Sequence, residues 1–239
     1  VVAAEREGIG VAHTGMTDLD QNLALARRCD VDLDDLQGLT GAEGDFAAGA
    51  DIAEIEGKTA AEGAADPRKA YWAAVRAFPK PLIAAVDGFA LGGGFELALM
   101  ADCIVLGATA KVGLPETNLG LIPGAGGAQR LLSLVGRARA SRLVLTGEIL
   151  PAATAFDWGI AGWLAEGSAE DVARPLTEKL AGRAPLAMQA AKAALIAGAE
   201  STLAFAQERA AFEALLDTAD KSEGIRAFRD KRKPGFTGT

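Results

Sequence analysis

The chain has 239 residues, of which 50% are hydrophobic and 23% are charged, so it can bury a sizeable core as one large or two small domains. Its formal net charge is −8 and its pI is about 4.8, which argues against a broad nucleic-acid or anionic-membrane surface. No apolar run is long enough to span a bilayer, and the two cysteines, Cys29 and Cys103, lack the paired spacing of a disulfide or zinc site. We therefore expect a cytoplasmic protein that uses no metal and binds neither nucleic acid nor membranes.

The single histidine limits the acid-base chemistry that the chain can perform. A serine or cysteine nucleophile activated by histidine would have to use His13, and no Gly-x-Ser-x-Gly elbow accompanies it. A surface or strand position without function is the favoured interpretation of His13. Proton transfer is therefore expected to depend on carboxylates, or on lysine and tyrosine.

The first part of the chain carries weak signals. Strands at residues 9–13 and 33–40 and a helix at 19–28 are possible, but Asp34 and Asp35 fit a buried strand poorly. A loop of small residues follows at 44–52, where a ligand could approach the backbone or where the chain simply enters the next helix. The later Gly57-Lys58-Thr59 does not complete a phosphate-binding loop, because that motif needs glycine at the position of Ile52.

The clearest pattern lies at residues 81–97. An apolar run at 82–86 predicts a buried strand, and Gly92, Gly93 and Gly94 precede a helix predicted at 95–101. Consecutive glycines at a helix start leave backbone N–H groups exposed at the positive end of the helix, which predicts an anion or oxyanion site. Glu96 lies in the first helical turn, within reach of that site. A tight glycine turn, with Glu96 serving only the helix dipole, explains the same residues equally well.

Strands and helices alternate around this segment. A helix at 68–78 ends before two prolines, a second apolar strand is predicted at 103–106, and residues 111–116 run into a loop that carries Glu116. A helix at 128–135 follows another glycine-rich stretch, but Gln129 stands where a dinucleotide-binding fingerprint needs its third glycine. The alternation through residue 165 predicts an α/β fold without a Rossmann site.

From about residue 168 the chain is predicted to be almost wholly helical. Ser168 precedes Glu170 and Asp171 as a helix start, and Pro175 predicts a kink or a restart. Further helices are predicted at 185–197, 201–216 and 222–232. The last two have wide apolar faces, formed by Leu203, Phe205, Phe212, Leu215, Leu216, Ile225 and Phe228. These faces pack on the α/β body or between subunits, and we favour contact between subunits.

Several segments, in order, resemble the crotonase, or enoyl-CoA hydratase/isomerase, superfamily. They are residues 46–52, 83–97, 113–116 and 119–127, continued at 145–147, 158–159, 223–225 and 231–234. The match runs from about Thr40 to the end. Before that, the chain lacks the family's Asn-Arg-Pro-like turn and Asn-Ala-Leu-like helix start between residues 9 and 22, so no coenzyme A contacts are inferred there.

The resemblance implies a fold and an assembly. Residues 1–180 would form a crotonase-like (ClpP/crotonase) α/β core, a spiral of β-β-α units that binds acyl-CoA. Residues 181–239 would form a C-terminal helical region that assembles a homotrimer or a dimer of trimers.

The resemblance also implies a reaction, the addition of water across the double bond of a trans-2-enoyl-CoA. Glu96 and Glu116 would be the catalytic carboxylates, and the backbone N–H groups of Ala50 and Gly93 would form the oxyanion hole. Further substrate contacts are implied for Ala48, Asp51, Ile52, Gly92, Pro115 and Gly124. No cofactor is expected, since coenzyme A is part of the substrate. An isomerase, a thioester hydrolase, a decarboxylase and a non-catalytic acyl-CoA binder remain alternatives.

The two acids are expected to divide the work. Glu96 lies at a glycine-started helix N-terminus, where the dipole favours its ionised form, whereas Glu116 lies on a loop without that bias. Glu96 is therefore expected to activate water, and Glu116 to deliver the proton to the α-carbon.

The apolar C-terminal helices generate a first prediction. Sedimentation velocity at micromolar concentration is expected to show a trimer or a hexamer, because these helices carry more apolar surface than a satellite region needs. A stable, well-folded monomer at that concentration would contradict the interpretation.

Overall fold

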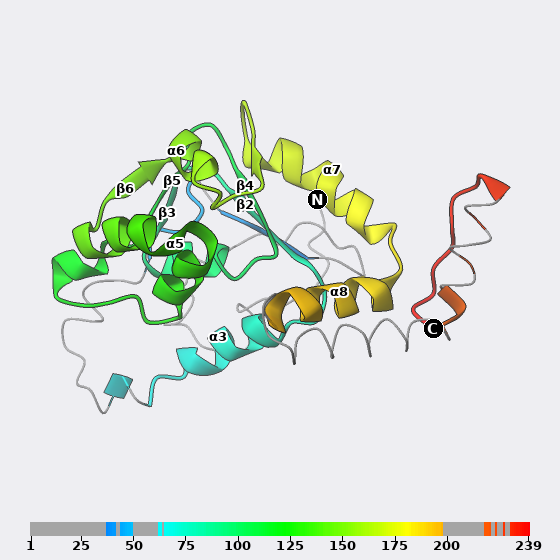
Figure 1. The fold of residues 1–239 in the computed structure, drawn as a ribbon, viewed down its shortest axis with the longest axis horizontal. Coiled ribbons are helices and arrows are strands. Elements are labelled where there is room, and N and C mark those ends of the chain that lie inside the picture. Colours follow the sequence, from blue (N-terminus) through cyan, green and yellow to red (C-terminus); the bar gives the residue numbers. More distant parts are fainter. Residues whose placement is uncertain are drawn as a thin grey trace, which may run out of the picture.

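The structure is a computed structural model, which describes residues 37–41, 44–49, 62–63, 65–197, 218–220, 223, 227 and 230–239 (Figure 1). The predicted elements at 9–13, 19–28 and 201–216, and much of the one at 222–232, lie outside these residues. Its elements are β1 (Gln37–Thr40), α3 (Arg68–Ala77), β2 (Leu82–Val86), β3 (Phe89–Leu91), α4 (Gly93–Ala98), β4 (Cys103–Leu106), β5 (Lys111–Gly113), the 3-10 helix η1 (Pro115–Leu119), α5 (Gly127–Thr146), β6 (Ile149–Pro151), α6 (Ala152–Asp157), β7 (Trp163–Leu164), α7 (Ala169–Ala181) and α8 (Pro185–Ala197).

Two sheets organise the described part of the chain. The first has the strand order β1-β2-β4-β7 and is parallel throughout, and the second has the order β3-β5-β6, with β6 antiparallel to β5. Parallel neighbours require crossover connections, so helices and the second sheet cover the first one. This arrangement confirms the predicted α/β class.

Strand β2 shows why its sequence is a continuous apolar run. All its residues are buried, and alternate side chains point to opposite faces. Ile83 and Ala85 pack with Ala169 and Ala173 of α7, whereas Ala84 and Val86 belong to the main core on the other face. Helix α7 therefore seals one side of the sheet, as its position beside β2 and β4 in Figure 1 indicates.

The start of α7 is held by a residue far away in sequence. Asp87 accepts the Ser168 hydroxyl at 2.7 Å and the Ala169 N–H at 3.0 Å, while Ser168 Oγ accepts the Glu170 N–H at 3.2 Å. The predicted start at Ser168 is confirmed. The helix does not restart at Pro175, because packing of its buried face on the sheet outweighs the loss of one backbone hydrogen bond.

Two other predicted boundaries change. Helix α5 extends to Thr146, well beyond the predicted 128–135, but its backbone leaves the helical region at Gly136, where φ is 72°. Glycine adopts that conformation without a Cβ clash. The predicted helix end at residue 135 therefore coincides with the kink at Gly136. Residues 115–119 form η1, so the prediction that Glu116 lies on an irregular loop is wrong.

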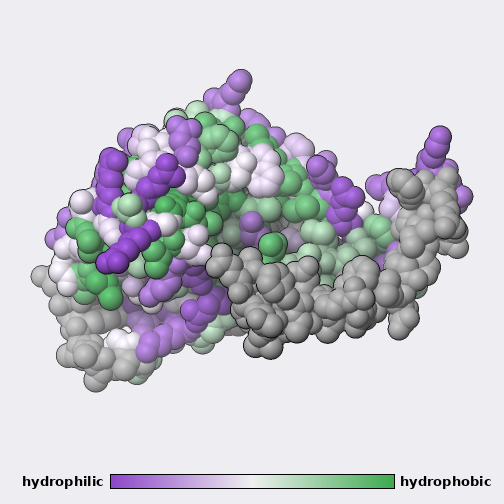
Figure 2. All heavy atoms as spheres, viewed as in Figure 1, coloured by the Kyte–Doolittle hydropathy of each residue, from purple (hydrophilic) through white to green (hydrophobic). Residues whose placement is uncertain are grey.

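The hydropathy of the surface differs from one helix to another. Hydrophilic residues lie over α3, none of whose residues is fully buried, and hydrophobic residues gather between α5 and α7 (Figure 2).

The described helices include none that is long and apolar enough to cross a membrane.

Helix α8 is attached to the start of β2 by a largely buried ion pair. Lys192 Nζ lies 2.7 Å from Asp102 Oδ2 and donates to the Lys80 carbonyl at 2.9 Å. The same carboxylate oxygen accepts the Leu82 N–H at 2.7 Å. One buried lysine, 7% exposed, therefore joins α8 to the two segments that begin β2 and β4.

Removing one partner of this pair is expected to destabilise the protein. Lys192→Met should lower the free energy of unfolding by about 3 kcal/mol, because it leaves the Asp102 carboxylate largely buried without its cation. The measurement is urea unfolding at one fixed protein concentration. Lys179→Met, at an exposed position on α7, is the control and should change the free energy by less than about 0.5 kcal/mol. An equally small effect of Lys192→Met would show that the pair does not hold α8.

Candidate active site

The parallel strands β3 and β5 bring two predicted site segments together. Leu91 pairs with Gly113 at their carboxyl ends, and the next residue, Gly92, donates its N–H to the Gly113 carbonyl at 3.0 Å. The chain then enters α4 from one strand and η1 from the other. Because carboxyl ends of parallel strands meet at one edge, the glycine turn and Glu116 become neighbours despite their separation in sequence.

Gly92 cannot carry a side chain in this position without strain. Its φ is 53°, and a Cβ would stand 3.3 Å from Glu116 Oε1. The Glu116 carboxylate therefore lies directly against the Gly92 backbone.

Gly93 is the first residue of α4, so its N–H has no partner within the helix. It bonds to no other described residue either. The other predicted donor, Ala50, lies outside the described residues, as do Asp51 and Ile52. The segment that leads to them does pass the glycine turn: Ala47 accepts the Leu91 N–H at 3.0 Å, and a Cβ on Gly49 would lie 3.0 Å from the Leu91 carbonyl oxygen.

Glu96 is only 3% exposed, and its carboxylate is held by backbone donors. Oε1 accepts the N–H groups of Ala125 and Gly127 at 2.7 and 2.8 Å. A Cβ on Gly127 would stand 2.8 Å from Glu96 Cγ, so glycine is needed here for close approach. Since both bonds go to Oε1, Oε2 is the oxygen that could accept a water molecule.

Glu116 has a different environment. It is partly buried, and Oε2 has no hydrogen-bond partner among the described residues. Burial raises the pKa of Glu116 above its usual range, the nearby Glu96 adds to this shift, and a hydrogen bond from its own backbone N–H acts in the opposite direction. The two acids thus lie within electrostatic reach of each other, and the surroundings of Glu116 disfavour its ionised form.

The backbone around Glu116 is attached to α5. Thr117 Oγ1 donates to the Val144 carbonyl at 3.1 Å, and Leu121 N–H donates to the Glu116 carbonyl at 3.1 Å. The Asn118 side chain lies over Gly147, where φ is 64° and a Cβ would be 2.6 Å from its Nδ2. The two ends of α5 therefore position the two acids. Gly127 at its start binds the Glu96 carboxylate, and Val144 near its end binds Thr117, the neighbour of Glu116.

The other predicted contacts lie around this pair. Pro115 begins η1 beside Glu116, whereas Ala48 and Gly124 are exposed. No described residue lies within 4 Å of a Cβ placed on Gly124. Sequence reasoning missed the roles of Ala125 and Gly127, although the glycine-rich stretch at 124–127 was the available signal.

Arg130 was also missed. Its Nη1 donates to the Ala125 carbonyl at 2.8 Å, so it fixes the loop that holds Glu96. Burial lowers the pKa of Arg130, the nearby Arg76 lowers it further, and Glu96 acts in the opposite direction. Within the described residues, no group of three or more histidine, cysteine or acidic side chains could hold a metal ion.

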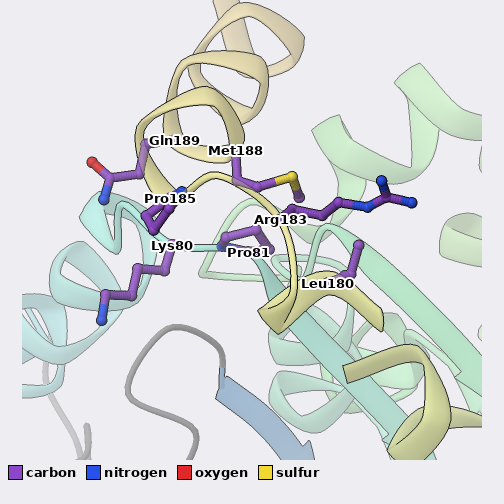
Figure 3. A pocket seen from close by; sticks show the side chains of 7 residues that line it. All are labelled: Lys80, Pro81, Leu180, Arg183, Pro185, Met188 and Gln189. Carbon is purple, nitrogen blue, oxygen red and sulfur yellow. The ribbon is translucent and has the colours of Figure 1, made fainter. Parts of the chain in front are cut away.

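A small pocket lies elsewhere, where α7 turns into α8 at the start of β2 (Figure 3). It is lined by Lys80, Pro81, Leu180, Arg183, Pro185, Met188 and Gln189. The charged ends of Lys80 and Arg183 point away from each other, and the pocket contains neither acid of the candidate site. The glycine turn, and not this pocket, is therefore the candidate active site.

Relatives and solved structures match most of the chain. The chain is 47% identical over 203 residues to 2,3-dehydroadipyl-CoA hydratase from Escherichia coli K12. The aligned region covers 84% of this chain and 80% of the relative. A crystal structure of enoyl-CoA hydratase from Bacillus anthracis matches with a TM-score of 0.80 and 36% identity, covering 86% of this chain and 82% of that chain. An enoyl-CoA hydratase subunit from Geobacillus kaustophilus HTA426 matches with a TM-score of 0.79 and 40% identity, with coverages of 85% and 80%. The enoyl-CoA hydratase/isomerase family model matches residues 38–239, and the chain belongs to that family.

Proposed function

We propose that the protein adds water to a trans-2-enoyl-CoA and releases the 3-hydroxyacyl-CoA. The observation that carries this proposal is the pair of acids beside the Gly92–Gly93 turn, one held by two N–H donors and the other with an unpartnered buried oxygen. Hydration needs one group to remove a proton from water and another to deliver a proton to carbon, and two acids can perform both steps.

In the proposed reaction, the oxygen of a water molecule held at Glu96 Oε2 bonds to C3 of the substrate, and Glu96 takes its proton. The C2–C3 π electrons move toward the thioester, whose carbonyl oxygen becomes negative. Glu116 then gives its proton to C2, which restores the thioester carbonyl.

The thioester oxygen would accept the Gly93 N–H, with Ala50 as the second donor that the resemblance implies. A preformed backbone donor of this kind stabilises the transition state by about 3–4 kcal/mol. Burial raises the pKa of Glu116, which supports its role as the acid because a higher pKa favours the protonated form that can donate.

The identity to the Escherichia coli relative favours one substrate in particular. That relative is named for 2,3-dehydroadipyl-CoA, a six-carbon enoyl thioester with a free carboxylate at the far end of the acyl chain. We infer that this thioester is among the substrates of the present protein. Assembly as a homotrimer or a dimer of trimers and a cytoplasmic location are proposed with it.

Replacing either acid is expected to suppress hydration. Glu96→Gln and Glu116→Gln should each lower kcat for trans-2-hexenoyl-CoA by at least about 100-fold, followed as loss of enoyl-thioester absorbance. The double variant should lose much less than the product of the two effects, because the acids act as a unit. Full activity of either single variant would refute the proposed pair.

Exchange of the α-hydrogens of a saturated acyl-CoA in deuterated water separates the two roles. This exchange needs the proton-carrying acid but no attacking water, so Glu116→Gln should abolish it while Glu96→Gln retains part of it. The opposite pattern would mean that the roles are reversed.

The raised pKa of Glu116 also predicts a pH dependence of stability. In the unfolded chain a glutamic acid titrates near about 4.3, so ionisation above that value costs the folded state stability, increasingly as pH rises through the folded pKa. Glu116→Gln cannot ionise and should therefore gain stability relative to the parent as pH rises above about 4.3, the pKa of the unfolded glutamic acid. Urea unfolding at fixed protein concentration is the measurement.

Glu148→Gln is the matched control. A hydrogen bond from Arg142 lowers the pKa of Glu148, so its contribution is present above the unfolded pKa and lost at lower pH. This control should lose stability relative to the parent as pH rises. The prediction for Glu116 fails if both variants change in the same direction.

A further inference from the structure

Arg76 lies on the side of α3 that faces the glycine turn. Trp72, Val75 and Phe78 pack against the main core, and Trp72 Cζ2 lies 3.9 Å from the point where a Cβ on Gly93 would stand. Arg76 follows Trp72 by four residues, which places it on the same side of the helix, one turn further along. Helix α3 therefore presents an aromatic side chain at the proposed oxyanion donor and a guanidinium one turn beyond it.

Arg130 supplies a second guanidinium near the same place from α5. The influence of Arg76 on the pKa of Arg130 requires the two charges to be within electrostatic reach of each other. Arg130 is committed to the Ala125 carbonyl, whereas Arg76 is exposed and pairs with no acid among the described residues. Of the two, Arg76 is the one with its donors available to a ligand.

The local charges favour an additional anion. Arg130 lies within electrostatic reach of both Arg76 and Glu96, and burial raises the pKa of Glu116. Whenever Glu116 is protonated, the two guanidiniums are opposed by the Glu96 carboxylate alone, which leaves one positive charge in excess. The overall charge of the protein is −8, which makes this local excess notable. A ligand carboxylate would balance it and would find a planar, bidentate donor in Arg76.

The spacing fits a short dicarboxylic acyl chain. One helical turn, from Trp72 to Arg76, advances roughly 5.4 Å. A fully extended six-carbon acyl chain spans roughly 6 Å between its two carboxyl carbons by standard bond lengths and angles. With the thioester oxygen at Gly93 beside Trp72, a carboxylate on C6 would come near the level of Arg76.

We propose that Arg76 binds the distal carboxylate of an ω-carboxylated enoyl-CoA and so determines specificity for dicarboxylic over monocarboxylic acyl chains. This inference rests on the proposed hydration. It assigns the recognition to a residue of α3 that lies outside the segments carrying the family resemblance.

The test compares two substrates that differ only at the far end of the chain. Hydration of 2,3-dehydroadipyl-CoA and of trans-2-hexenoyl-CoA is measured for the parent, Arg76→Met, Arg76→Lys and Arg137→Met. Arg137 is an exposed residue of α5, so its substitution removes the same charge away from the proposed contact.

Arg76→Met is expected to lower kcat/KM for 2,3-dehydroadipyl-CoA by about 10- to 100-fold, the scale of one hydrogen-bonded contact to a charged group. Most of the loss should appear in KM. Activity on hexenoyl-CoA should change by less than about 3-fold, Arg76→Lys should recover part of the loss, and Arg137→Met should resemble the parent for both substrates.

Four results would overturn the inference. If Arg76→Met lost the same activity on both substrates, Arg76 would support the site in general. If Arg76→Met lost no activity on either substrate, Arg76 would contact neither acyl chain. A parent that hydrates hexenoyl-CoA but not the dicarboxylic thioester would refute the inference and leave the proposed hydration standing. A parent that hydrates neither would refute both.

Discussion

The buried carboxyl group of Glu96 is the constraint on which the rest of the site depends. A polar group that is only 3% exposed costs free energy unless it is hydrogen-bonded, and its donors come from a loop about 30 residues later in the chain. Satisfying Glu96 therefore fixes the start of α5 against α4. Because the other end of α5 binds η1 through Thr117 and Val144, the same helix also places Glu116.

Close approach of other segments explains these glycines better than flexibility does. A Cβ on Gly94 would collide with the Ala47 carbonyl, one on Gly127 with Glu96, and one on Gly92 would press on Glu116. Each contact joins segments that are distant in sequence. The glycines thus allow the Ala47 backbone and the Glu96 and Glu116 side chains to approach closely near the edge of the second sheet, where the N–H groups at the start of α4 become available to a ligand.

The sequence predicted those features whose signals are local. Strands β2 and β4 were predicted with their observed bounds because they are apolar runs, and α3 and α8 followed from periodicity and proline boundaries. The very short strands β3, β6 and β7 carry too few residues for a periodic signal. Contacts between remote segments were also beyond local reasoning: the donors to Glu96, the capping of α7 by Asp87 and the proximity of Arg76 to Arg130 depend on tertiary structure.

The proposed division of roles between the two acids was argued from their helix positions, but the structure distinguishes the two acids in another way. Glu116 lies in η1, near the start of a short helix, so the absence of a helix does not distinguish it from Glu96. What distinguishes them is the supply of donors: two N–H groups from another segment reach Glu96, whereas a buried oxygen of Glu116 has no partner among the described residues. Two carboxyl groups of the same type, both beside one glycine turn, are thus given different hydrogen-bond partners by the loops around them, and burial raises the pKa of Glu116. This difference suits a reaction that needs one acid and one base.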